Sequence, residues 1–384
     1  MALTAPTTTR EPRDAHKLDD ASLLRWLVAN VDACRGATGA TVRQFKGGQS
    51  NPTYWIGVEG VASGADAPGG ELELVVRKKP PGDLLPSAHA VEREYRIMKA
   101  LDGTGVPVPK ALGLCDDASV IGTPFFVMKH VNGRIFWDPT IPEVASNDER
   151  AAIYDDYIRV LARLHRVDYA KVGLGDYGKV GGYVARQVDR WSKQYEASRT
   201  SEIPAMEALL AFVRGKTPAS DETTLIHGDY RIDNIMYSSH AERGDGDAPG
   251  TQQQMQPAAI AVIDWELSTL GHPVSDLAYA CMGYHLNLPG RGGLAGVDVA
   301  ALGIPNEQEM VDAYCKQTDR AGIADWPYFM AFGIFRLAAI AQGVYKRSLQ
   351  GNASSDNASS YGAAVTMLAE LGCSIAAIPT TSQP

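Results

Sequence analysis

The hydrophobic pattern of this 384-residue chain changes its period about one third of the way along. In the first third, short stretches of alternating apolar residues predict strands at Thr41–Phe45, Tyr54–Val58 and Leu72–Arg77. A helix with one apolar face is predicted over Ala88–Leu101, and a further strand within Val120–Val131. The pattern therefore predicts a small antiparallel sheet with an inserted helix, preceded by a polar N-terminal segment and a short amphipathic helix.

The rest of the chain has mostly helical spacing, interrupted by short apolar runs that predict strands at 225–227, 235–237 and 259–263. The polar insert between the last two strands is predicted to form a long hairpin loop. We expect an α+β protein with a polar tail (1–20), a sheet lobe (21–130), a helical lobe (131–378) and a C-terminal tail (379–384), with a cleft between the lobes.

Composition excludes several classes of function. Lys and Arg number 36 and Asp and Glu 45, so the formal net charge is 36 − 45 = −9. A chain this acidic is not expected to bind nucleic acid or an anionic membrane surface. The five scattered cysteines indicate a reducing compartment, and no secretory signal is visible. The apolar stretch Tyr328–Tyr345 is interrupted by Arg336 and Gln342 and falls short of a membrane span. We expect a soluble, cytoplasmic protein.

A glycine-rich segment, Gly173–Val180, matches two phosphate-binding patterns, G-x-G-x-x-G and G-x-x-x-x-G-K. Both patterns need a strand before the glycines and a helix after them, because the helix N-terminus receives the phosphates. Here the residues before the segment have the pattern of a helix end. Val180 also replaces the hydroxyl that would hold a metal ion. The segment is therefore predicted to be a connector.

Polar residues follow two of the short predicted strands. Leu225–Asn234 reads LIHGDYRIDN, and Val262–Glu266 reads VIDWE. Pairing of these strands as a hairpin would bring Asp229, Asn234 and Asp264 together at the mouth of the cleft. Two carboxylates and an amide suit Mg²⁺, which prefers oxygen ligands and shares them with substrate phosphates. Each aspartate alone is more typical of a turn; the combination favours a metal and phosphate site.

The pattern H-G-D-x-x-x-x-N followed by I-D-W resembles the aminoglycoside phosphotransferase and choline kinase-like family, whose fold is like that of eukaryotic protein kinases. The resemblance extends from about Val42 to Arg347. The segments RKKPPGDLLPSAHAVEREYR and FRLAAIAQGVYKR are most similar to kinase-like domains found beside acyl-CoA dehydrogenases. This resemblance implies a bilobal protein kinase-like fold, with a small antiparallel-sheet N-lobe that binds nucleotide and a larger helical C-lobe that holds the catalytic loop, metal site and acceptor site.

The resemblance also implies roles for the polar residues of the C-lobe. Asp229 would orient the acceptor hydroxyl and take its proton, and His227 would hold the catalytic loop. Asn234 and Asp264 would hold Mg²⁺ against the nucleotide phosphates, where charge must be neutralised. Asp276 is similar to the helix aspartate that binds the catalytic-loop backbone, although a helix N-cap is an alternative interpretation.

In the N-lobe, the resemblance places a loop over the phosphates at Lys46–Thr53, where Ser50 would donate a hydrogen bond. This loop lacks the G-x-G-x-x-G of protein kinases. The segment Met128–Val131 would be the hinge, with backbone groups of Met128, Lys129 and Val131 directed at adenine.

The cation of the third strand is ambiguous, because Arg77 and Lys78 are adjacent. Strand alternation places Leu72, Leu74 and Val76 on one face and Arg77 on the other. If the first set packs away from the nucleotide, Arg77 faces the phosphates, with Glu94 as its helix partner. A bulge after Val76 would instead favour Lys78.

These observations predict an enzyme, an ATP- and Mg²⁺-dependent phosphotransferase that acts on a hydroxyl group of a small molecule. One alternative is a degenerate kinase fold that binds nucleotide or a partner without catalysis, and nothing in the motifs supports degeneracy. A protein kinase is disfavoured because HGD replaces HRD and no A-P-E segment follows Asp264. The choice between ATP and GTP, and the oligomeric state, stay open.

An aminoglycoside is not expected as the acceptor, because a polycation needs a cluster of carboxylates. The predicted helix Tyr183–Glu196 has a charge balance of +3 − 2 = +1, and Trp326–Gly351 contains no acidic residue. Arg336 lies in an apolar run and needs an anionic partner if it is buried. That partner is either a carboxylate elsewhere in the lobe or an acidic group of the substrate, such as a hydroxy acid or its coenzyme A thioester.

Overall fold

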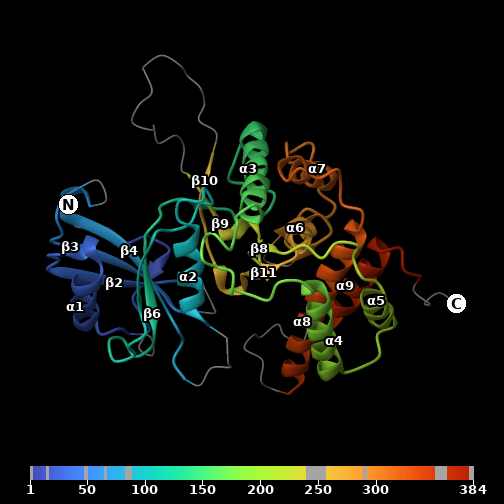
Figure 1. Ribbon diagram of the computed structural model, residues 1–384, viewed down its shortest axis with the longest axis horizontal. Helices are drawn as coiled ribbons and strands as arrows, with labels where there is room; N and C mark the ends of the chain where they lie inside the picture. The colour runs from blue at the N-terminus through green and yellow to red at the C-terminus, as the bar shows by residue number, and fades with distance from the viewer. Residues whose placement is uncertain are drawn as a thin grey trace, which may run out of the picture. The chain divides into compact units, whose positions relative to one another are not determined.

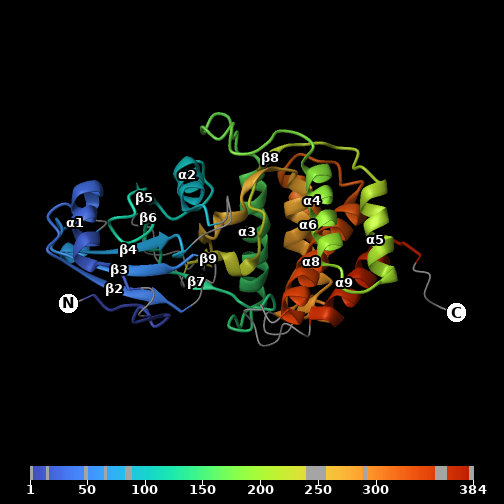
Figure 2. The ribbon, with the colours of Figure 1, turned by 90° about the horizontal axis from the view of Figure 1, so that it is seen from below.

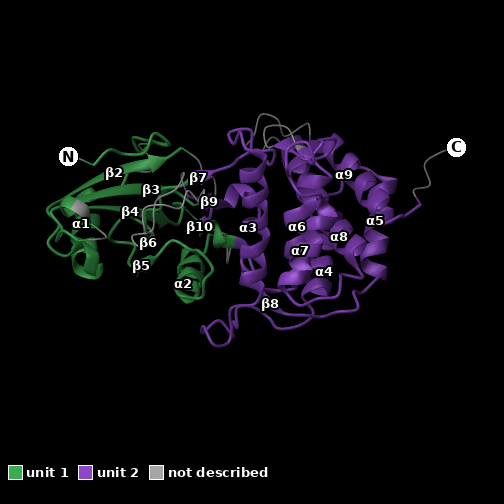
Figure 3. Ribbon diagram, turned by 90° about the horizontal axis from the view of Figure 1, so that it is seen from above, with its two compact units in different colours: residues 1–133, 260–266 green, residues 134–259, 267–384 purple. Residues whose placement is uncertain are grey.

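The structure is a computed structural model that describes residues 3–13, 17–46, 51–64, 67–82, 89–238, 257–288, 292–350 and 361–379. Figure 1 shows the order of the elements along the chain. The chain forms two compact units (Figure 3). Unit 1 contains residues 1–133 and 260–266, and unit 2 contains residues 134–259 and 267–384. The short segment 260–266, which includes the predicted metal ligand Asp264, therefore groups with the N-terminal part of the chain.

Unit 1 is built on a six-stranded antiparallel sheet. Its order is β1-β2-β3-β4-β6-β5. The predicted strands in this region are confirmed, and the sheet also contains two strands that the pattern did not indicate, β1 and β5. The bounds are β1 (Thr9–Arg10), β2 (Gly39–Phe45), β3 (Thr53–Glu59), β4 (Glu71–Lys78), β5 (Ala111–Cys115) and β6 (Phe125–Lys129).

Two helices cover this sheet, one on each face. Helix α1 (Asp20–Asn30) contributes Leu23 and Leu27 to a core that includes the even-numbered residues of β4. Helix α2 (Val91–Leu101) contacts β5 and β6, and its Glu94 pairs with Arg77, an odd-numbered residue of β4. Alternation along a strand sends successive side chains to opposite faces. Single turns of 3₁₀ helix complete the unit at Asp32–Cys34 and Pro68–Gly70.

Unit 2 is mainly helical, and Figure 2 shows α4, α6, α8 and α9 running side by side with α5 at the outer edge. Helix α8 is central, because it packs against α4, α5, α6 and α9. The bounds are α3 (Asn147–His165), α4 (Tyr183–Ser198), α5 (Pro204–Gly215), α6 (Pro273–Cys281), α7 (Glu307–Gln317), α8 (Trp326–Leu349) and α9 (Tyr361–Ile375), with 3₁₀ turns at Ile232–Asn234, Trp265–Leu267 and Met282–Tyr284.

The expected hairpin is present, because the short strands at 235–237 and 259–262 are hydrogen-bonded neighbours in one sheet. Strand β8 (Thr224–Ile226), which leads into the HGD motif, pairs with β11 (Thr269–Gly271), a strand that was not predicted. Strand β9 (Ile235–Tyr237) pairs with β7 (Arg134–Ile135). The remaining short strands are β12 (Asn287–Leu288), β13 (Gly292–Gly293) and β10 (Ala259–Val262), of which residues 260–262 belong to unit 1. The predicted hairpin loop between β9 and β10 lies mostly outside the described residues.

The glycine-rich connector also behaves as predicted, because Gly173–Val180 lies in turns after the end of α3. A Cβ atom on Gly178 would lie 2.5 Å from Thr269 Oγ1 and 2.8 Å from the Leu270 backbone nitrogen. Gly178 is therefore a packing residue against β11, since only glycine leaves room for that backbone.

Helix α8 is long and apolar enough to cross a membrane by length and composition alone, contrary to the expectation from its sequence. Most of its apolar window, 72%, is buried inside unit 2. Core helices of globular proteins pass the same test, so this helix alone is weak evidence of a membrane span.

Candidate active site

The HGD motif forms a loop directly after β8, and Asp276 of α6 holds its backbone. One carboxylate oxygen of Asp276 accepts the His227 N–H at 2.7 Å, and the other accepts the Gly228 N–H at 2.8 Å. The N-cap of α6 is instead His272. The predicted contact of Asp276 with the catalytic-loop backbone is therefore confirmed, and the alternative as a helix cap is wrong.

Histidines complete the support of this loop. His227 is fully buried and its Nδ1 accepts the Asp229 N–H at 3.3 Å, in line with the structural role expected for it. His165, which sequence reasoning missed, lies between Asp276 Oδ2 at 3.3 Å and the Tyr314 hydroxyl at 2.7 Å. Burial raises the pKa of the Asp276 carboxyl, but His165 and His227 outweigh that effect and the pKa lies below its usual range. Asp276 is thus an anion that fixes the loop.

The carboxylate of Asp229 is partly exposed and lies among polar partners within unit 2. Asn234 donates from its amide to the Asp229 carbonyl oxygen at 2.9 Å and to its carboxylate at 3.3 Å. The structure thus brings these two predicted residues together, with the 3₁₀ turn at Ile232–Asn234 closing the loop. Two further partners were not predicted: Arg231 Nε lies 3.6 Å from Asp229 Oδ1, and burial together with the Asp229 carboxylate raises the pKa of the Tyr279 hydroxyl.

Arg336 reaches the same loop from helix α8. Both terminal nitrogens of its guanidinium donate to the Gly228 carbonyl oxygen, at 3.3 and 3.2 Å. The guanidinium carbon lies 5.6 Å from the ring centroid of Trp191 and 5.5 Å from that of Tyr279. Among the described residues, no carboxylate pairs with Arg336.

In unit 1, Arg77 is the centre of a cluster of three carboxylates. Its guanidinium lies 2.9 Å from Glu94, 2.9 Å from Asp264 and 3.5 Å from Glu266. The predicted partnership of Arg77 with Glu94 is confirmed. The even-numbered residues of β4 pack in the core with α1, so Arg77 points to the opposite face, as the alternation implied.

Lys78 points the other way. The register of β4 against β3 and β6 is continuous through its end, without a bulge after Val76. Lys78 is buried, and its ammonium group donates to the Ile121 carbonyl oxygen at 2.7 Å. Burial lowers the pKa of Lys78. The Lys78 side chain therefore lies on the α1 side of the sheet, opposite Arg77. This orientation does not support the prediction that Lys78 binds nucleotide.

A chain of polar contacts extends from Glu94 to the start of β3. Asn51, almost fully buried, donates from its amide to Glu94 at 2.8 Å, and His89 Nδ1 lies 3.0 Å from the side-chain oxygen Oδ1 of Asn51. Burial raises the pKa of Glu94 to about 7, although Arg77 acts in the opposite direction. Asn51 lies within the loop predicted to cover the phosphates. Ser50, the residue chosen from that loop, lies outside the described residues.

The predicted hinge begins with the last two residues of β6. Met128 pairs with Val75 of β4, and the Lys129 N–H donates to the Lys110 carbonyl oxygen. Val131 lies beyond the end of β6. The described hydrogen bonds do not test whether this segment binds adenine, so that interaction stays a prediction.

Asp264 adopts a left-handed backbone conformation, with φ of 66°, which is uncommon for a residue other than glycine. Val262, two residues before Asp264, is fixed by its N–H bond to the Pro107 carbonyl oxygen, and the Trp265 indole donates to the Val262 carbonyl oxygen. One oxygen of Asp264 binds Arg77, and the side chain is about one third exposed. Strained residues of this kind cluster at functional sites.

The donor chemistry of Asn234 and Asp264 fits a hard cation. The Asn234 amide nitrogen is used within its loop, so its oxygen is the atom available to a metal, and Asp264 has a second oxygen. No three His, Cys, Asp or Glu side chains of the described chain form a group that could hold a metal ion by themselves. A metal bound by either of these side chains relies on further ligands, such as phosphate oxygens and water.

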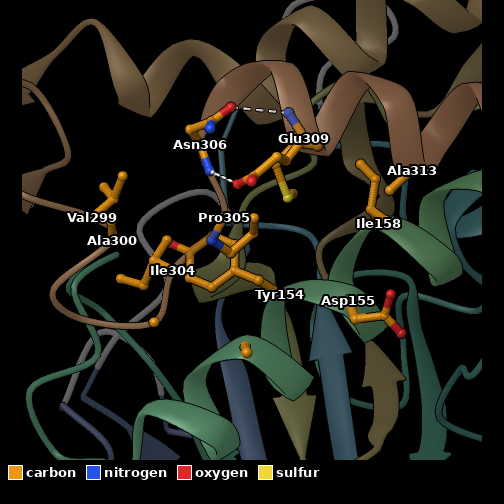
Figure 4. A pocket seen from close by; sticks show the side chains of 13 residues that line it. Tyr154, Asp155, Ile158, Val299, Ala300, Ile304, Pro305, Asn306, Glu309 and Ala313 are labelled. Carbon is orange, nitrogen blue, oxygen red and sulfur yellow. Dashed lines mark hydrogen bonds between the residues drawn. The ribbon is translucent and has the colours of Figure 1, made fainter.

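A separate hollow of about 470 Å³ lies between α3, the segment 299–306 and α7 (Figure 4). Its wall is mainly apolar, with Tyr154, Ile158, Ile304 and Met310. Asn306 and Glu309 on its rim bind each other in the capping box of α7. None of the predicted site residues lines this hollow.

The antiparallel sheet unit, the helical unit and a buried aspartate that holds an HGD loop together define a protein of the kinase-like class. A sequence profile of the phosphotransferase enzyme family matches residues 41–310. The chain belongs to this family, which confirms the resemblance found from the HGD and IDW motifs.

Curated relatives agree with this assignment. The chain is 46% identical to acyl-CoA dehydrogenase family member 10 of Mus musculus over 85% of its own length and 28% of the relative's. It is 41% identical to acyl-CoA dehydrogenase family member 11 of Rattus norvegicus over 97% of its length and 45% of the relative's. The chain therefore spans less than half the length of these relatives. The expected similarity to domains beside acyl-CoA dehydrogenases is confirmed.

Solved structures show the same fold. A putative aminoglycoside phosphotransferase from Ralstonia eutropha is 42% identical, with a TM-score of 0.79 over 94% of this chain and 99% of that one. An aminoglycoside phosphotransferase in a ternary complex with ADP and hygromycin B is 11% identical, with a TM-score of 0.53 over 94% of this chain and all of that one. The predicted fold class, a sheet N-terminal region and a helical C-terminal region of the kinase-like type, is confirmed.

Proposed function

We propose that this protein transfers the γ-phosphoryl group of ATP to a hydroxyl group of a small molecule, with Mg²⁺ as the cofactor. The observation that carries the proposal is the HGD loop, in which Asp276 fixes the backbone and Asn234 binds Asp229. Such a loop holds the Asp229 carboxylate in a defined orientation. A residue that receives a proton from a substrate must be oriented in this way. Membership of the phosphotransferase family supports the same reaction class.

In the proposed reaction, Asp229 accepts a hydrogen bond from the acceptor hydroxyl and takes its proton. The acceptor oxygen forms a bond to the γ-phosphorus as the bond between that phosphorus and the bridging oxygen breaks, and ADP leaves with the electron pair of that bond. Mg²⁺, when bound, neutralises charge on the phosphate oxygens. Asn234 and Asp264 are the residues that would hold it.

Arg77 is the proposed phosphate-binding cation of unit 1. Its guanidinium is held by Glu94, which is itself bound by Asn51. A planar guanidinium with several donors suits phosphate oxygens, and the contacts with Glu94 reduce the freedom that binding would otherwise remove.

The acceptor is proposed to be a hydroxy acid or a hydroxyacyl thioester rather than an aminoglycoside. The relatives named acyl-CoA dehydrogenase family members carry a region similar to this whole chain. A domain that phosphorylates a hydroxyacyl group would act on the same class of molecule as a dehydrogenase of acyl thioesters.

The test is ADP release by wild-type protein and by Asp229→Asn with a panel of hydroxy acids and their coenzyme A thioesters. We expect Asp229→Asn to bind ATP with Mg²⁺ as wild type does and to lose at least 100-fold in kcat, since general-base catalysis contributes about 10²–10⁴-fold. Full activity of Asp229→Asn would remove Asp229 from the mechanism. A wild-type protein that binds ATP but releases no ADP with any acceptor would favour the degenerate, binding-only alternative.

A further inference from the structure

Arg336 is a cation without an anion in the described part of unit 2. It lies on α8, whose residues from Trp326 to Leu349 include no aspartate or glutamate. Of its five N–H groups, two share the single carbonyl oxygen of Gly228, at 3.2 and 3.3 Å. Its Nε is buried and has no hydrogen-bond partner. A partly buried guanidinium is seldom left with so few acceptors, because burial of an unpaired charge is costly.

Aromatic rings hold the guanidinium in place. Trp191 of α4 and Tyr279 of α6 lie 5.6 and 5.5 Å from its carbon. Rings at this distance stabilise a cation through their π faces and leave its N–H donors free. Arg336 is therefore held in one position by groups that do not neutralise it.

The position of Arg336 relates it directly to the reacting carboxylate. Gly228, which it binds, is covalently joined to Asp229, and Tyr279, which it faces, interacts electrostatically with the Asp229 carboxylate. A short acceptor could therefore place a hydroxyl at Asp229 and an acidic group at Arg336. The charged neighbours on α4 within this region are Arg186 and Arg190, which add positive potential near the same rings.

We propose that Arg336 determines the specificity of the acceptor site by binding an oxyanion of the acceptor, either a carboxylate or a phosphate. This inference rests on the proposed phosphotransfer at Asp229 and identifies the residue that selects an acidic acceptor. Charge-assisted hydrogen bonds to a guanidinium would satisfy the donors that Gly228 leaves unused.

The experiment compares hydroxybutyrate isomers, their uncharged methyl esters and their coenzyme A thioesters as acceptors for ADP release. The variants are Arg336→Gln, Arg336→Lys and the control Arg190→Gln, which removes an exposed arginine beside the same Trp191 ring. In wild type we expect kcat/KM to be higher for the charged acceptors than for the methyl esters. A preference for the acids indicates a carboxylate as the bound group, and a preference for the thioesters alone indicates a phosphate.

Arg336→Gln should lower kcat/KM for the charged acceptor by roughly 10- to 100-fold, mainly through KM, because charge-assisted hydrogen bonds are lost. It should leave kcat/KM for the methyl ester and the KM for ATP unchanged. A merely structural role of Arg336 would alter these two quantities as well as kcat/KM for the charged acceptor. Arg336→Lys should restore part of the preference, and Arg190→Gln should retain it. An equal loss of kcat/KM with charged and uncharged acceptors, or no loss, would overturn the inference about Arg336. The proposed function would still stand if activity depended on Asp229.

If no acceptor is turned over, a binding measurement tests the inference about Arg336 instead. Hydroxybutyrate and coenzyme A are titrated by calorimetry into Asp229→Asn protein saturated with ADP and Mg²⁺, with and without Arg336→Gln. Binding that Arg336→Gln weakens by tenfold or more supports the oxyanion site even if phosphotransfer fails. No binding of either probe, or equal binding by both proteins, overturns it.

Discussion

Arg77 and Asp264 share a hydrogen-bonded ion pair, with 2.9 Å between the guanidinium nitrogen and one carboxylate oxygen. The pair joins the proposed phosphate-binding cation to a proposed metal ligand within unit 1. In the absence of nucleotide, Arg77 and Asp264 neutralise each other's charge. We therefore expect the two residues to act together on the metal–triphosphate unit.

Asp264→Ala should weaken ATP binding in the presence of Mg²⁺ by roughly tenfold or more, which corresponds to about 1.4 kcal/mol. The reason is the loss of one hard oxygen ligand. In calorimetry without metal, the variant should bind ATP at least as well as wild type, since Arg77 loses a competing carboxylate. Glu266→Gln, at 3.5 Å from the same guanidinium, is the control and should change the metal dependence less. Equal Mg²⁺ dependence in wild type and Asp264→Ala would make Asp264 a turn residue.

Arg77 should matter more than Lys78 for nucleotide affinity. Arg77→Lys keeps a charge beside the buried Glu94 but loses the planar fork, so we expect weaker ATP binding without unfolding. Lys78→Ala should leave ATP affinity unchanged and lower the free energy of unfolding by roughly 1–3 kcal/mol, because the Ile121 carbonyl loses its charged donor. Calorimetry and urea unfolding of both variants provide the comparison. A larger loss of affinity in Lys78→Ala would contradict the face assignment.

Asp276→Asn should reduce kcat with little effect on ATP affinity. An amide offers one acceptor oxygen where the carboxylate offers two, so it cannot accept both the His227 and the Gly228 N–H in the same way. One buried backbone donor is left unpaired, at a cost of about 1–3 kcal/mol in the free energy of unfolding. Kinetics and urea unfolding measure both effects. His165→Gln, which removes the histidine on the far side of Asp276, should give a smaller loss of kcat; normal kcat in Asp276→Asn would exclude a positioning role.

The sequence predicted features that depend on residues close together in the chain and missed features that depend on residues far apart in it. Alternation along β4 was sufficient to separate Arg77 from Lys78, because that signal is local. Strand β11 has only three residues, and its pairing with β8 depends on a contact 45 residues away, from Leu270 to Leu225. The same holds for Arg336, whose partner at Gly228 lies 108 residues away. No local pattern could show which oxygen that arginine reaches.

The candidate site divides in the same way. The spacing of HGD and Asn234 placed those residues in one loop, and the loop contacts agree with that spacing. Tyr279 and His165 lie on helices whose patterns also suit plain core residues, so only the tertiary structure shows their contacts with Asp229 and Asp276.

Glu94 predicts a pH dependence of stability. Burial raises its pKa from 4.5 to about 7 in the folded protein, so between these values the folded state binds more protons than the unfolded state. The contribution of Glu94 is therefore fully present below about pH 4.5 and is lost as the pH rises to about 7. The difference in unfolding free energy between wild type and Glu94→Gln should fall over this range and be flat above it. A difference that rises with pH would contradict the raised pKa.

Aminoglycosides should be poor acceptors. A polycation needs several unpaired carboxylates in its site, because they must replace the hydration of its ammonium groups. On α4, Asp189 is paired with Lys193 and Glu196 with Arg214, each at 2.8 Å.

Helix α8 adds no acidic residue and directs the guanidinium of Arg336 at the loop of Asp229, so the local potential repels a cation. Kanamycin should give ADP release no higher than the rate with water as the acceptor, and Arg336→Glu should raise its turnover while that of hydroxy acids falls. Strong kanamycin turnover by wild type, with none of hydroxy acids or their thioesters, would show that the acceptor site has the opposite charge preference.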